Sequence, residues 1–112
     1  HRRVAEAIKE EVADILRSMQ DPRIGFASVV AVEMSPDLAH ARVYVSVLGD
    51  RAAQEASLRA LTRAAGLVRR ELGQRIRLRH TPEIDFRLDE SLAHGDRIHR
   101  LLREIHAQEE HP

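Results

Sequence analysis

The centre of the chain, residues 58–72, reads Leu-Arg-Ala-Leu-Thr-Arg-Ala-Ala-Gly-Leu-Val-Arg-Arg-Glu-Leu. Apolar side chains recur within and just beyond it at the spacing i, i+3, i+4, i+7, at Leu58, Leu61, Ala65, Val68, Leu72 and Ile76. At roughly 100° per residue, these six positions cover a sector of about 80° on a helical wheel. The pattern predicts an amphipathic helix across residues 51–76 whose apolar stripe packs on a core.

The side of this helix away from the apolar stripe is basic. Three arginines lie close together there on the wheel and are called the basic ridge below: Arg59, Arg63 and Arg70. In the helix interior, glycine at position 66 makes the helix less stable by about 1 kcal/mol than alanine would. Packing, a kink or chance has to explain the presence of Gly66. The small residues Ala64, Ala65 and Gly66 would let the helix kink and let a ligand approach its backbone.

Charge is segregated along a chain whose formal net charge is zero. Residues 59–80 contain seven arginines and one acid, a net charge of +6, whereas residues 83–112 carry a net charge of −4. A neutral protein with such a segment can present a strongly positive face.

The overall composition excludes several classes of protein. No apolar run approaches the ~20 residues of a membrane span, and no signal peptide is visible. Cysteine is absent, which excludes disulfides and thiolate metal sites and suits a cytoplasmic location.

The rest of the chain predicts two further helices and three strands. Residues 3–20 carry a helical apolar stripe that Asp21-Pro22 ends. The runs 27–34 and 41–47 read as an antiparallel hairpin around a turn at 35–38, and 83–88 reads as a third strand. A last helix is expected after residue 91, with apolar positions at Ile98, Leu101, Leu102 and Ile105.

The connections between these elements predict the sheet. A strand, a helical crossover and a second strand normally form a right-handed parallel pair. We therefore expect an α+β domain with a three-stranded mixed sheet, order 1-2-3, and helices packed on one face.

We expect one domain over residues 1–112, with its core at about 3–105 and a frayed tail at 106–112. Asp50 is expected to cap the central helix, and Gly73 could mark its C-terminal break.

The order of elements is that of a type II KH-like domain, and several short motifs resemble those of the ribosome-binding factor A family. The resemblance covers about residues 2–105. It is carried, in order, by Arg3-Val4-Ala5-Glu6, Asp21-Pro22-Arg23-Ile24-Gly25, Val32-Glu33-Met34-Ser35-Pro36-Asp37-Leu38, Ala41-Arg42-Val43-Tyr44-Val45-Ser46-Val47-Leu48-Gly49, Arg63-Ala64-Ala65-Gly66, Thr81-Pro82-Glu83-Ile84 and Leu88-Asp89-Glu90-Ser91.

The resemblance implies a cytoplasmic, non-enzymatic factor that binds the small ribosomal subunit and assists late maturation of its rRNA. It also implies that the factor is needed most in the cold and that other assembly or initiation factors release it from the subunit. A monomer is expected. In the family an alanine–x–glycine kink between two helices replaces the Gly-x-x-G loop of ordinary KH domains, and Ala64-Ala65-Gly66 fits that pattern. No Gly-x-x-G occurs in this sequence, which argues against gripping four single-stranded nucleotides.

Basic side chains in and around the central helix are the candidates for RNA binding, because guanidinium groups bind phosphate oxygens in pairs. The candidates are Lys9, Arg59, Arg63, Arg69, Arg70, Arg75, Arg77 and Arg79. The plain alternative is a solvated face with local ion pairs. Aromatic residues are few: Phe86 is expected in the core, and Tyr44 is expected to cover the sheet, so recognition by shape and backbone is favoured over base stacking.

Other chemistry finds little support in the sequence. His94, His99 and His106 do not have the i, i+4 spacing that directs two imidazoles at one metal ion. Asp89, Glu90 and Asp96 could imitate an acid pair but are explained by capping and solvation. No phosphate-binding loop, dinucleotide fingerprint or nucleophile elbow occurs. We expect no catalytic residue, metal or cofactor; the alternative function is a protein-binding module that recruits another assembly factor.

Overall fold

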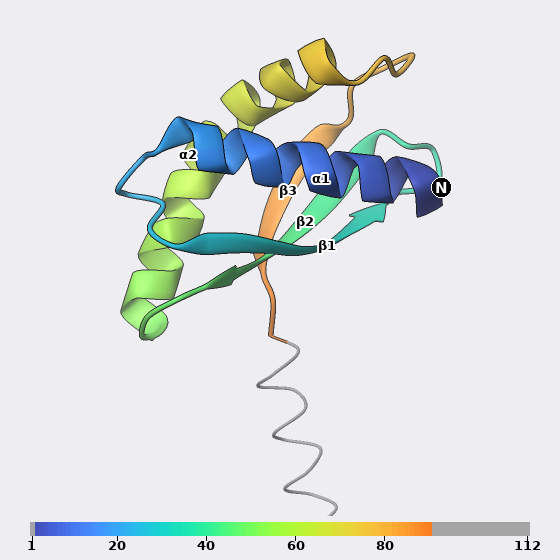
Figure 1. Ribbon diagram of the computed structural model, residues 1–112. Helices are drawn as coiled ribbons and strands as arrows, with labels where there is room; N and C mark the ends of the chain where they lie inside the picture. The colour runs from blue at the N-terminus through green and yellow to red at the C-terminus, as the bar shows by residue number, and fades with distance from the viewer. Residues whose placement is uncertain (1, 91–112) are drawn as a thin grey trace, which may run out of the picture.

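The computed structural model describes residues 2–90 and contains two helices and three strands (Figure 1). In chain order these are α1 (Arg2–Met19), β1 (Ala27–Met34), β2 (His40–Val47), α2 (Arg51–Arg75) and β3 (Glu83–Leu88). The expected elements within this range are confirmed, with boundaries shifted by one residue at most. The expected last helix and frayed tail lie outside the described residues.

The sheet has the expected order, β1-β2-β3. β1 and β2 are antiparallel, with Val32 opposite Val43, and β2 and β3 are parallel, with Val43 opposite Phe86. β2 and β3 are parallel because α2 crosses over between them and returns the chain to the end of the sheet at which β2 begins. The register shifts between Val29 and Ala31, which marks a bulge in the edge strand β1.

Both helices cover the same face of the sheet, so the core lies between the helices and this face (Figure 1). The strict alternation along β2 decides which face that is, because successive side chains of a strand point to opposite sides. The fully or almost fully buried core residues are Ile8, Val12, Ile15, Ile24, Ala41, Val43, Val45, Leu61, Val68, Leu72 and Phe86. On the open face Tyr44 is half-buried and its hydroxyl donates to Glu33 at 3.0 Å, so it covers the sheet as expected.

The ends of α2 are set by specific contacts. The Asp50 carboxylate accepts a hydrogen bond from the backbone N–H of Ala53 at 2.9 Å, which confirms the predicted cap. The helix continues past Gly73 to Arg75, and the backbone turns extended at Ile76. Gly73 therefore does not end the helix.

The predicted kink lies inside one helix and not between two. Residues 51–75 form a single α-helix, and Ala64, Ala65 and Gly66 fall near its middle. Figure 1 shows the axis of α2 changing direction between its green first part and its yellow second part. The two parts consequently present the basic side chains along a bent surface.

Candidate nucleic-acid interface

The basic ridge lies on the outer side of α2, where all three arginines are exposed. Within residues 2–90 none of the three forms an ion pair, since the acids that pair do so with other arginines or with His40. The pKa of Asp21 is lowered first by hydrogen bonds from Arg23 and last by the charge of Arg63. The guanidinium groups of the ridge are therefore available to an external anion.

An open groove of about 460 Å³ adjoins the ridge at Arg70. One wall comes from the second part of α2 and the other from the loop at residues 76–82. The lining residues are Gly66, Arg69, Arg70, Gly73, Arg79, His80 and Thr81, and none of them is acidic. The structure thus places Arg79 of the loop beside Arg69, Arg70 and Gly66 of the helix, which joins three of the predicted RNA-binding arginines to one of the kink residues.

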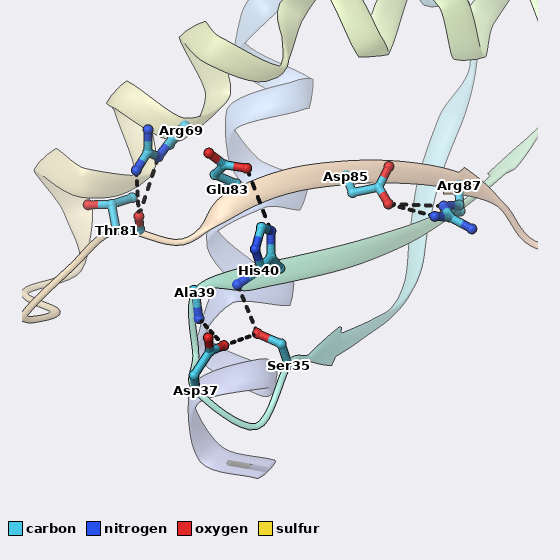
Figure 2. A network of polar contacts seen from close by, with 9 residues as sticks. All are labelled: Ser35, Asp37, Ala39, His40, Arg69, Thr81, Glu83, Asp85 and Arg87. Carbon is cyan, nitrogen blue, oxygen red and sulfur yellow. Dashed lines mark hydrogen bonds and ion pairs between the residues drawn. The ribbon is translucent and has the colours of Figure 1, made fainter.

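The loop at residues 76–82 is held against α2 by two hydrogen bonds. The Arg69 guanidinium donates to the Thr81 carbonyl oxygen from Nε at 3.3 Å and from Nη2 at 3.0 Å, as Figure 2 shows. A Cβ atom added at Gly73 would lie 2.9 Å from the Thr81 hydroxyl oxygen, so the threonine would have to move. Pro82 follows and is fully buried. Gly73 is therefore the place where the loop approaches the helix most closely. The tendency of glycine to end helices does not predict this role.

Gly66 has the opposite surroundings. A Cβ atom added there would meet no atom within 4 Å, although the residue lines the groove. Packing inside the protein therefore does not require a glycine at this position. What the glycine provides is bare backbone at the groove surface, which a ligand can approach closely.

Arg75 does not belong to this surface. Its guanidinium pairs with Asp14, and with Glu11 at 3.4 Å, both on α1, and its side chain is only 29% exposed. The hydrogen bond from Arg75 is the main reason why the pKa of Asp14 is lowered. Arg75 lies about 140° around the helix from Arg70, so it points towards α1. It ties the two helices together, which differs from its predicted role.

The remaining candidates divide in a similar way. Arg77 and Arg79 are exposed in the loop, and Arg79 lines the groove. Lys9 is half-buried on α1 and does not line it. His80 also forms part of the groove wall.

No cluster of three or more possible metal ligands occurs within residues 2–90. Glu90 pairs with Arg51 at 3.2 Å, which explains one of the acids considered above. His94, His99, His106 and Asp96 lie outside the described residues. In the described part of the chain, neither helix has the length and apolar character that crossing a membrane requires.

Comparison with known proteins points to one family. The model of the ribosome-binding factor A family matches residues 1–102. Ribosome-binding factor A of Desulforamulus reducens is 50% identical over 111 residues, which is 98% of this chain and 92% of that protein. The agreement in sequence therefore extends over nearly the whole of both chains.

Solved structures agree with this result. The crystal structure of ribosome-binding factor A from Thermus thermophilus has a TM-score of 0.71 and 30% identity, covering 78% of this chain and 93% of that one. A homology model of the Thermus thermophilus factor, fitted into a cryo-EM map of a 30S complex, has a TM-score of 0.65 and 30% identity, covering 77% and 91%. The expected KH-like α+β fold is confirmed.

Proposed function

This chain belongs to the ribosome-binding factor A family, and on that premise we propose that it binds the small ribosomal subunit through rRNA and assists late maturation of that RNA. A relative was fitted into a map of a 30S complex, which supports the partner. The protein acts in the cytoplasm as a monomer, catalyses no reaction, is needed most in the cold, and is released by other assembly or initiation factors.

The observation that carries the RNA-binding proposal is that the exposed basic ridge meets the groove. Arg70 belongs to both, and no acidic side chain lines the groove. Arginines that neutralise phosphates release condensed counterions, so such a surface gains free energy from RNA binding at moderate salt. The two-pronged guanidinium group adds geometric preference for phosphate oxygens.

The mechanism is positional. A surface fixed on a bent helix fits phosphates in one spatial arrangement better than in others, so binding shifts the RNA towards that arrangement. Exposed aromatic surface is scarce along the groove, and Phe86 is buried in the core. Affinity therefore comes mainly from the backbone and shape of folded RNA.

Charge reversal tests this function. The variant Arg59→Glu, Arg63→Glu, Arg70→Glu should lose co-sedimentation with small subunits while its melting temperature stays close to that of the wild type. The control reverses the same number of exposed arginines on α1 and the open sheet face, Arg17, Arg42 and Arg87, each of which pairs with an acid. The control should still bind. Retained binding by the ridge variant, or equal loss in both, would refute the proposed surface.

A second function has one observation in its favour. Phe26 and Leu48 are 82% and 77% exposed, and the backbone N–H of Leu48 donates to the carbonyl oxygen of Phe26 at 3.1 Å. Two exposed large apolar residues whose backbones are hydrogen-bonded to each other suit a protein partner. If this contact dominates binding, affinity for the subunit should depend only weakly on salt and should fall on Phe26→Ser.

A further inference from the structure

We propose that the loop at residues 76–82 holds one unpaired nucleotide of the bound RNA, with its phosphate in the basic groove and its base in an adjoining apolar pocket. This inference rests on the proposed function and makes it more specific. It adds a single base contact to a surface that otherwise binds phosphates.

The apolar pocket lies between the start of α1, the turn between β1 and β2, and the loop. Its volume is about 310 Å³, and apolar side chains form most of its wall. The lining residues are Val4, Met34, Asp37, Leu38, Ala39, Leu78, Arg79 and His80. A concave apolar site with a few polar groups at its edge is the usual form of a small-ligand site.

The pocket and the groove share a wall. Arg79 and His80 line both of them. An occupant that spans this wall meets a cationic surface on one side and an apolar cavity on the other. A nucleotide has these two parts in one molecule, an anionic phosphate and a flat base, whereas an apolar protein side chain satisfies only one of them.

The far wall of the pocket is fixed before any ligand arrives. The Asp37 carboxylate accepts hydrogen bonds from the Ser35 hydroxyl at 2.7 Å and from the Ala39 backbone N–H at 3.1 Å (Figure 2). These bonds hold the turn in which Leu38 adopts a φ of 61°, a left-handed conformation that leucine rarely takes. A wall held in this way needs little further ordering on binding.

Asp37 also indicates which bases fit best. The hydrogen bonds from Ser35 and Ala39 lower the pKa of its carboxyl group, so the group is ionised at neutral pH and accepts hydrogen bonds only. An ionised carboxylate has about four lone-pair sites, so it can accept a further bond. A base with a hydrogen-bond donor on its edge, such as the amino group of cytosine, can therefore bond to this carboxylate.

The test compares two single-stranded oligoribonucleotides of equal length, oligocytidine and an oligomer with abasic sites throughout, which carry the same phosphates. The wild type should bind oligocytidine about tenfold more tightly, because the base buries apolar surface in the pocket and the abasic oligomer does not. Ala39→Leu narrows the pocket from an exposed position and should remove the difference while leaving abasic binding unchanged. Ala31→Leu, on the open side of β1, should preserve it.

Three results would overturn the inference. Equal affinity of the wild type for both oligomers would show that no base is held. A difference that survives Ala39→Leu would place the base elsewhere. If Ala39→Leu weakens binding to whole subunits but not to oligocytidine, the pocket takes an apolar protein side chain instead. Each of these results is compatible with subunit binding through the ridge, whose failure the charge-reversal experiment detects separately.

Discussion

Thr81 packs so closely on Gly73 that a Cβ atom added at the glycine would lie 2.9 Å from the threonine hydroxyl oxygen. The missing side chain lets the loop at residues 76–82 rest on α2, where Arg69 holds the Thr81 carbonyl oxygen. Because Arg79 and His80 precede Thr81 in the same loop, this contact positions one wall of the groove.

Gly73→Ala should therefore destabilise the protein, although alanine is favoured over glycine in a helix by about 1 kcal/mol. The added methyl group forces Thr81 away from the helix. Urea denaturation should show a lower midpoint for the variant than for the wild type.

A rescue variant checks the cause of this loss. Adding Thr81→Ala removes the hydroxyl oxygen and leaves the Cβ of residue 81 at an ordinary distance of 3.8 Å. The double variant should recover the stability of Thr81→Ala alone or exceed it. If Gly73→Ala is as stable as the wild type, the close contact does not hold the loop.

Gly66→Ala should have the opposite effect on stability. The new methyl group meets no neighbouring atom, so the helix propensity of alanine should raise the free energy of unfolding by up to about 1 kcal/mol. Affinity for the small subunit should fall, because the methyl group occupies the groove surface. A stabilised variant with unchanged affinity would show that no ligand approaches the backbone there.

The fold could be predicted from the sequence because its strongest signals are periodic. The alternation at Ala41, Val43, Val45 and Val47 identified the buried face of β2, and Asp50 stood where a helix cap is needed. The roles of Gly73 and Arg75 could not be predicted in the same way. Each depends on a partner from another element, Thr81 or Asp14, and the distance between two packed elements is not encoded in the periodicity of either one.

Periodicity also predicted part of the candidate site. The wheel of α2 correctly put Arg59, Arg63 and Arg70 on its exposed side. Net charge, in contrast, counted Arg75 as one more free cation, although its guanidinium pairs with Asp14 and Glu11 of α1. The apolar pocket left no signal, since its lining comes from separate segments of the chain.

Arg75→Gln should lower stability without lowering affinity for RNA. The hydrogen bond from Arg75 depresses the folded-state pKa of Asp14, so the ion pair stabilises the fold above the usual carboxyl pKa of about 4. This contribution is lost as the pH falls through the lowered value. Denaturation midpoints of variant and wild type should differ at pH 7 and converge at strongly acidic pH. A difference that persists in acid would assign another role to Arg75.

The salt dependence of binding to purified small-subunit rRNA tests the central claim most directly. In a plot of log affinity against log salt concentration, each lost phosphate contact lowers the steepness by about 0.7 to 0.9. If the basic ridge binds phosphates, Arg59→Gln, Arg63→Gln, Arg70→Gln should give a slope shallower than that of the wild type by about 2 to 3. The matched variant with glutamine at positions 17, 42 and 87 should keep the wild-type slope. Equal slopes for the ridge variant and the wild type would contradict the account.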